Sequence, residues 1–159
     1  MTKAARGFTL IEILVVIVLI AIAATLVTVK LQPDDRGLLR EEALRLAALL
    51  TQARDEAVIT GASIGWRGAS DGYSFYRRNA ERQWQAIEGD EVFHSRNLPT
   101  DARITEIEIA DVKVNPEHML ILSGSAANPP YRIVLAYREA RVQVRADPSA
   151  AANVENLPQ

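Results

Sequence analysis

A single carboxylate at the start of a long apolar stretch is the side chain with the clearest chemical consequence in this chain. Glu12 is followed by an uncharged apolar run from Ile13 to Val29. A charged side chain costs about 2.5–3.5 kcal/mol at the centre of a membrane helix and less near its end. We therefore expect Glu12 to be functional and to pair with a cation.

The cation could come from the chain itself or from a neighbouring subunit. A cut after Gly7 would give Phe8 a free α-amino group about one helical turn from Glu12, where the helix N-terminus adds partial positive charge. The same amine of a neighbouring subunit would also fix the stagger between adjacent helices. This arrangement predicts a role for Glu12 in assembly.

The residues around Glu12 predict a helix that spans a membrane. With Phe8–Ile11 the apolar run is about 33 Å long at 1.5 Å per residue, which is enough for a bilayer core. Lys3 and Arg6 precede it without an acid. The positive-inside rule then places the N-terminus in the cytoplasm and everything after Lys30 across the membrane.

An ordinary secretory signal peptide is the alternative interpretation of this N-terminus. Such a peptide also has a basic start, an apolar stretch and a small-residue cleavage site, for which Ala21-Ile22-Ala23 would serve. A discarded segment gains nothing from an acid in hydrocarbon, so Glu12 favours a helix that is retained.

The segment Arg6-Gly7-Phe8-Thr9-Leu10-Ile11-Glu12 resembles the class III processing signal of type IV prepilins, and the chain beyond it resembles the H-type minor pseudopilins of the GspH/FimT-like family. The resemblance implies that a prepilin peptidase cuts between Gly7 and Phe8 and methylates the new amine of Phe8. It also places Glu12 at the family's acidic fifth mature position. The expected divisions are a leader over 1–7 and a transmembrane and assembly helix over 8–30.

The composition predicts one modest head domain behind this helix. Of 159 residues, about 130 follow the apolar run, which is enough for a single core. Lys and Arg total 18 against 20 Asp and Glu, a net charge of -2, so the chain has no general attraction for nucleic acid or an anionic surface. Cysteine is absent, which excludes disulfides and thiolate catalysis.

The head, over 31–146, is predicted to be α+β and pilin-like. A break is expected near Pro33, because proline removes a backbone donor. Apolar residues then recur at helical spacing over 38–60, which predicts an amphipathic helix packed on its own sheet, although a partner's groove could take the same face.

Beyond Gly61 the apolar period becomes alternating, which predicts an antiparallel β-sheet over 62–146. The tail over 147–159 is rich in Ala, Asn and Pro and is predicted to be disordered. The expected strands are 62–67, 72–77, 82–87, 92–94, 103–109, 119–122, 131–137 and 141–145.

Several residue groups have the types found in catalytic or metal sites but not the required context. Gly61-Ala62-Ser63-Ile64-Gly65 fits G-x-S-x-G, yet a nucleophile elbow has a strand before the serine and a helix after it, and here the predicted order is reversed. His94 and His118 lack the spacing of metal ligands. Asp71-Gly72 and Gly89-Asp90-Glu91 are typical of turns rather than calcium loops. We expect no enzyme activity, no metal and no cofactor.

Two groups of arginines near aromatic side chains are candidate nucleic-acid contacts. Strands with a solvated arginine face explain much of the pattern, whereas phosphate binding needs several cations on one face. Nucleic acid is therefore not expected as a partner. The first group is Arg77, Arg78 and Arg82, and the second is Arg132, Arg138, Arg141 and Arg145.

The resemblance implies a structural subunit of the type II secretion pseudopilus that helps to export folded proteins across the outer membrane. Its implied partners are other major and minor pseudopilins, the prepilin peptidase and the inner-membrane secretion assembly platform. The implied location is the inner membrane, single-pass with a periplasmic head, and then the pseudopilus. The alternatives are a FimT-like minor pilin of a type IV pilus, acting in pilus assembly or DNA uptake, and a membrane-anchored enzyme with a perturbed acid or base pair.

Overall fold

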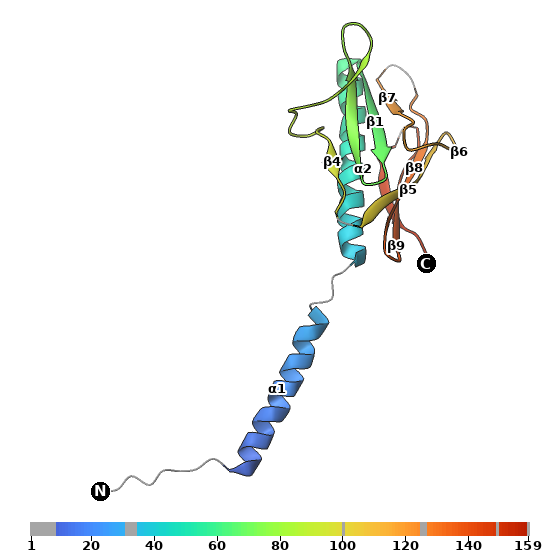
Figure 1. Ribbon diagram of the computed structural model, residues 1–159. Helices are drawn as coiled ribbons and strands as arrows, with labels where there is room; N and C mark the ends of the chain where they lie inside the picture. Colours follow the sequence, from blue (N-terminus) through green and yellow to red (C-terminus); the bar gives the residue numbers. More distant parts are fainter. Residues whose placement is uncertain (1–8, 31–34, 100, 125–126, 149, 159) are drawn as a thin grey trace. The chain divides into compact units, whose positions relative to one another are not determined.

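The computed structural model describes residues 9–30, 35–99, 101–124, 127–148 and 150–158, and for 24–30 it describes the backbone alone (Figure 1). The first two elements are helices of different character. They are α1 (Leu10–Lys30) and α2 (Asp35–Thr60). The chain divides after residue 34 into an N-terminal unit that contains α1 and a head unit that begins at Asp35. The break predicted near Pro33 falls on 31–34, outside the described residues.

Apart from Glu12, every described side chain of the helix α1 is apolar. Its large apolar side chains between Leu10 and Ile22 are all exposed, from 46% at Val16 to 84% at Leu10. An amphipathic helix would hide one stripe against its domain and show a polar face elsewhere, and α1 has neither. No helix in the described part of the chain is long and apolar enough to cross a membrane.

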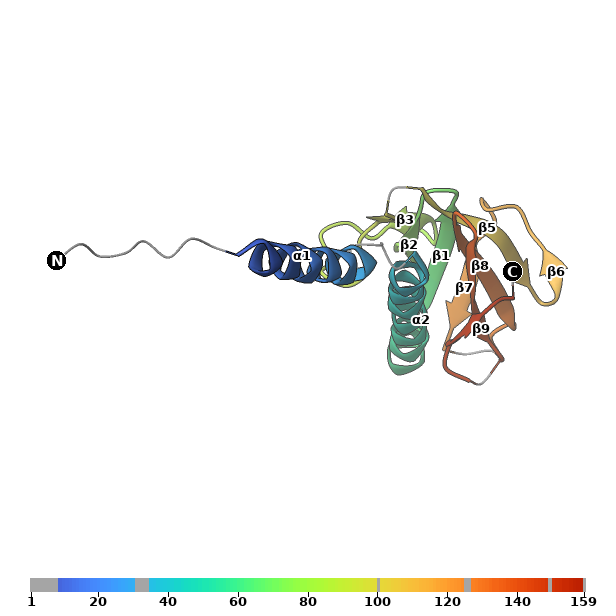
Figure 2. The same ribbon diagram turned by 90° about the horizontal axis from the view of Figure 1, so that it is seen from below.

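The helix α2 is one-sided, as the helical period over 38–60 predicts, and it begins at Asp35. A carboxylate in the first turn is favourable next to the partial positive charge of a helix N-terminus. The helix packs on strands of its own head, seen beside β1, β7 and β9 in Figure 2, which confirms the prediction of a helix covering its own sheet. Its buried residues are Leu39, Ala43, Leu46, Ala47, Leu49, Leu50, Ala53 and Ala57.

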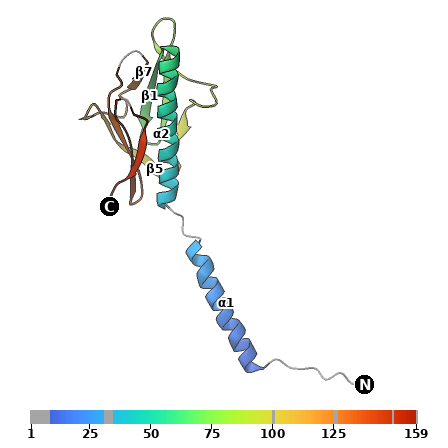
Figure 3. The same ribbon diagram turned by 180° about the vertical axis from the view of Figure 1, so that it is seen from behind.

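The head contains two antiparallel five-stranded sheets where the sequence predicted one. The first has the order β3-β2-β1-β7, with β4 also paired to β2, and the second has the order β10-β9-β8-β5-β6. Figure 3 shows them from behind. The strands are β1 (Ser63–Ala69), β2 (Gly72–Arg78), β3 (Trp84–Ala86), β4 (Arg96–Asn97), β5 (Ala102–Ile109), β6 (Val112–Lys113), β7 (Leu120–Ser123), β8 (Tyr131–Tyr137), β9 (Ala140–Ala146) and β10 (Asn153–Asn156).

The strand predictions hold best where apolar alternation is long. β8 has the predicted bounds, and β1, β2, β3, β5, β7 and β9 lie within two residues of theirs. The strand predicted over 92–94 is wrong. Asp90 Oδ1 accepts the backbone N–H groups of Val92 and Phe93, at 2.8 and 3.0 Å, and this bonding holds the segment in a turn. The short strands β4 and β6 were not predicted.

The prediction of a disordered tail is wrong over Asn153–Asn156, which forms β10 on the edge of β9. The tail also binds α2, because Arg54 donates to the carbonyl of Ala150 at 2.7 Å and the Ala152 N–H donates to Thr51 Oγ1 at 3.1 Å. A polar composition does not exclude order when an edge strand and a helix offer hydrogen-bond partners.

Four aromatic side chains form the centre of the core near the first sheet. Trp66 and Tyr73 have ring centroids 6.3 Å apart, Tyr73 and Phe75 lie 6.1 Å apart, and Phe75 and Phe93 lie 5.1 Å apart. Trp66 and Phe75 are fully buried and Tyr73 is 3% exposed. The hydroxyl of Tyr73 is buried without a hydrogen-bond partner among the described residues. Loss of hydration there raises the pKa of Tyr73 to about 12.

We predict that Tyr73 makes the head sensitive to alkali. Because its folded pKa lies above its usual value near 10, the stability it contributes is intact below about pH 10 and is lost as the pH rises through 12. Tyr73→Phe should therefore unfold at a similar urea concentration to the unaltered chain at pH 7, and should be more stable by about 1 kcal/mol at pH 11. Urea titrations followed by tryptophan fluorescence measure both. An equal difference at the two pH values would contradict the assignment.

Candidate functional site

Of the predicted processing and assembly residues, the structure describes only Glu12. Gly7 and Phe8 lie outside the described residues, so the cleavage site remains a prediction. Glu12 is exposed in the first turn of α1, and its backbone N–H donates to the carbonyl of Thr9 at 3.1 Å. A carboxylate in this turn is favoured by the helix dipole and can accept a cation from outside the helix.

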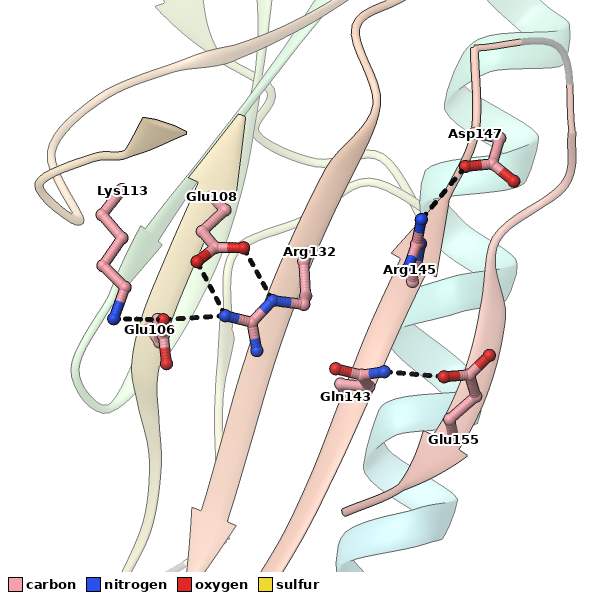
Figure 4. Close-up of polar contacts among 8 residues, drawn as sticks. All are labelled: Glu106, Glu108, Lys113, Arg132, Gln143, Arg145, Asp147 and Glu155. Atoms are coloured by element: carbon pink, nitrogen blue, oxygen red, sulfur yellow. Dashed lines mark hydrogen bonds and ion pairs between the residues drawn. The ribbon is translucent and has the colours of Figure 1, made fainter. Parts of the chain in front are cut away.

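A group of four connected charged side chains lies on the second sheet (Figure 4). Arg132 of β8 donates to both carboxylate oxygens of Glu108 on β5, at 2.7 Å each, and to Glu106 at 2.8 Å. Lys113 of β6 lies 2.7 Å from Glu106. Glu106 and Glu108 are two residues apart on a strand and so share one face of the sheet. The group joins three neighbouring strands.

The charges of this group compensate one another. The hydrogen bond from Arg132 holds the pKa of Glu108 below its usual range, and the bond to Glu108 raises the pKa of Arg132. Both shifts favour the charged forms, whereas a general acid or base needs a pKa moved toward neutrality. The adjoining hollow, of about 100 Å³, is lined in part by Asp111, Tyr131 and Arg145. The arrangement suits a structural clamp.

Most arginines of the two predicted groups are engaged inside the head. Arg77 pairs with Glu56, and Arg78 lies over the ring of Trp84 at 4.8 Å. Arg138 lies 3.1 Å from Asp35, and Arg145 lies 3.6 Å from Asp147 (Figure 4). With Arg132 held by two glutamates, the arginines do not form one free cationic face.

The serine and histidine candidates have simple surroundings. Ser63 opens β1 directly after α2, so a helix precedes it and a strand follows it, as predicted. His94 Nδ1 lies 3.1 Å from the backbone oxygen of Asp90. In the part of the chain that is described, no three His, Asp or Glu side chains are grouped as they would be to hold a metal ion.

A second hollow, of about 190 Å³, was not predicted from the sequence. It lies between the first turn of α2, the start of β9 and the chain that follows β10. These segments are distant in the sequence, so no local pattern could have grouped them. Among its lining residues are Arg36, Arg141, Val142, Asn156, Leu157 and Pro158.

Comparison with protein-family models finds two matches that together cover most of the chain. Residues 2–28 match the prokaryotic N-terminal methylation motif, and residues 42–150 match the type II transport protein GspH. The first match contains the predicted cleavage site and Glu12, and the second contains most of the head.

Two similar curated proteins carry the name type II secretion system protein H. The chain is 38% identical to the one from Aeromonas hydrophila over 106 residues, which are 65% of this chain and 57% of that protein. It is 32% identical to the one from Pseudomonas aeruginosa over 152 residues, which are 86% of each.

Solved structures of minor pseudopilins have the same fold. The minor pseudopilin EpsH of the Vibrio cholerae type 2 secretion system superposes with TM-scores of 0.59 and 0.61 in two structures, at 15% and 16% identity. They cover 74% and 75% of this chain and 96% and 94% of the EpsH chains. The solution structure of Escherichia coli GspH gives a TM-score of 0.57 at 14% identity, covering 79% of this chain and 94% of that one.

We predict that Glu108 stabilises the head in a pH-dependent manner. Its lowered pKa means that this contribution is present above the usual carboxyl pKa, near 4.3, and is lost as the pH falls through the folded value. Glu108→Gln should therefore lower the urea midpoint at pH 7, and the difference from the unaltered chain should shrink at pH 3. Glu139→Gln, at an exposed acid without an ion pair to a described residue, is the control. A difference that persists at pH 3 would argue against the Arg132 contact as its cause.

Proposed function

Since this chain belongs to the GspH family of type II transport proteins, we propose that it is a minor pseudopilin, a structural subunit of the type II secretion pseudopilus that helps to export folded proteins across the outer membrane. The observation that carries this proposal is the match of residues 42–150 to that family behind an N-terminal methylation motif. The α+β head and its likeness to EpsH support it.

The proposal includes processing at the N-terminus. Prepilin peptidase cuts between Gly7 and Phe8 on the cytoplasmic side and methylates the new amine of Phe8. The methylation motif over 2–28 supports this step. The cut also supplies the positive charge that Glu12 needs, because it leaves an α-amino group about one helical turn away.

Glu12 acts in assembly under this proposal. Its carboxylate pairs with the amine of Phe8, either in the same chain or in the neighbouring subunit, as α1 enters the filament. Two features support this role: Glu12 is exposed in the first turn, and the apolar side chains of the described part of α1 are exposed on all sides. A helix of this kind gains most from neighbours that are also apolar, and one fixed ion pair then sets its position along them.

The helix over 8–30 anchors the precursor in the inner membrane in the same proposal, with the head in the periplasm. Its support is the uncharged run from Ile13 to Val29 and the basic residues Lys3 and Arg6 before it. The proposed partners of the protein are the other pseudopilins, the prepilin peptidase and the inner-membrane assembly platform. Nucleic acid is not among them, since five of the seven arginines considered for it are engaged within the head.

The intact mass of the chain extracted from membranes tests the processing step. The expected mass is that of residues 8–159 plus one methyl group. A chain that has lost residues 1–23 would instead indicate a secretory signal peptide and would remove the basis of the proposed anchor. A chain that keeps Met1 or Thr2 would refute cleavage at Gly7.

Glu12→Gln tests the assembly role separately. The variant keeps the size of the side chain and removes its charge, so the N-terminal mass should be unchanged. Incorporation into the pseudopilus, measured by co-purification with the other pseudopilins, should fall at least about tenfold, because an amine in an apolar filament loses its partner. Glu91→Gln, at an exposed acid of the head, should be incorporated normally. Normal incorporation of Glu12→Gln would rule out the ion pair.

A further inference from the structure

The Arg36–Arg141 hollow, defined by the six lining residues given above, is a polar feature that the proposed function leaves unused. Arg36 belongs to the first turn of α2, and Arg141 is the second residue of β9. Both side chains are exposed, and both line the hollow. The hollow thus brings together two guanidinium groups from distant parts of the sequence.

The charges of Arg36 and Arg141 are not compensated by a described residue. Most other arginines of the head hold an acid or lie over an aromatic ring, whereas neither of these two forms an ion pair within the described part of the chain. The acid next to Arg36 is already used, because Asp35 accepts from Arg138 at 3.1 Å. Two cations therefore share one concave site.

The chemistry of the hollow favours a phosphate group. Guanidinium groups bind phosphate oxygens in paired hydrogen bonds, and the first turn of a helix adds partial positive charge. A volume of about 190 Å³ is below the range of about 300–1,000 Å³ typical of sites for drug-sized ligands, so it suits a phosphate with few attached atoms. Val142, Leu157 and Pro158 offer an apolar wall to those atoms.

We propose that this hollow binds the phosphate of an anionic phospholipid headgroup, which holds the head at the membrane surface before assembly. The inference rests on the membrane anchor of the proposed function. Only residues 31–34 separate Lys30 from Asp35 in the sequence, so an anchored α1 keeps the first turn of α2 within chain reach of the headgroups. A free phosphate ester has the same chemistry, and the experiment separates the two sources.

The full processed chain is inserted into nanodiscs of phosphatidylcholine alone or with phosphatidylglycerol, and amide hydrogen exchange is measured over 140–142 and 156–158. The amide of Leu157 is a direct reporter, because it donates to the carbonyl of Arg141 at 3.1 Å. We expect exchange there to slow at least about fivefold with phosphatidylglycerol, and the effect to weaken with added salt. A third sample adds glycerol 3-phosphate to the phosphatidylcholine discs.

The variant Arg36→Gln with Arg141→Gln should lose the protection, whereas Arg82→Gln should keep it. Arg82 is a matched control, since it is also exposed without an ion pair to a described residue. Unchanged near-ultraviolet circular dichroism checks that the double variant is folded. If it is not, Arg36→Lys with Arg141→Lys replaces it, with weakened protection expected because lysine lacks the paired donors.

Three outcomes would overturn the inference. Protection by glycerol 3-phosphate without protection by phosphatidylglycerol would assign the site to a free phosphate ester. Equal loss in Arg82→Gln would indicate a general attraction between the head and an anionic surface. Insertion into the discs without any slowing of amide exchange at the hollow would refute the phosphate site and leave the proposed membrane anchor intact. A chain that fails to enter the discs at all would instead refute the membrane anchor of the proposed function.

Discussion

The packing of one apolar face of α2 across both sheets is the contact on which the head depends. Leu39, Leu46 and Leu50 are fully buried there, in the same core as Trp66 of the first sheet and Leu135 of the second. Each such leucine contributes about 1.5–3 kcal/mol relative to an exposed side chain. Neither sheet could bury its inner face alone, so the helix is the common surface that makes two small sheets one domain.

The two helices of the chain differ in where their apolar side chains lie. α2 uses its apolar stripe inside the head and shows a largely polar face to solvent, whereas the described apolar side chains of α1 are left exposed. Apolar surface of that extent needs lipid or other helices to cover it. An acid within such a surface is tolerated only with a partner, which is the reason for the role in assembly that we propose for Glu12.

Several arginines of the head are paired with an acid close by. Arg132 pairs with two glutamates of the neighbouring strand, and Arg138 pairs with Asp35 in the first turn of α2. These contacts hold neighbouring segments together. They also engage two of the arginines that, from the sequence alone, could have formed a surface for nucleic acid. Arg36 and Arg141 form no ion pair with a described residue, and both line one hollow.

The sequence by itself determined the features that depend on neighbouring residues. The one-sided helix over 38–60, the long alternating strands such as Tyr131–Tyr137 and the N-terminal signal around Glu12 are all visible locally, because backbone geometry imposes periods of 3.6 and 2 residues on buried side chains. The tertiary structure alone decided the separation into two sheets, the pairing of β10 with β9 and the arginines that find an acid. Those outcomes depend on which distant segments meet in space, and a polar tail or an isolated arginine carries no local sign of its partner.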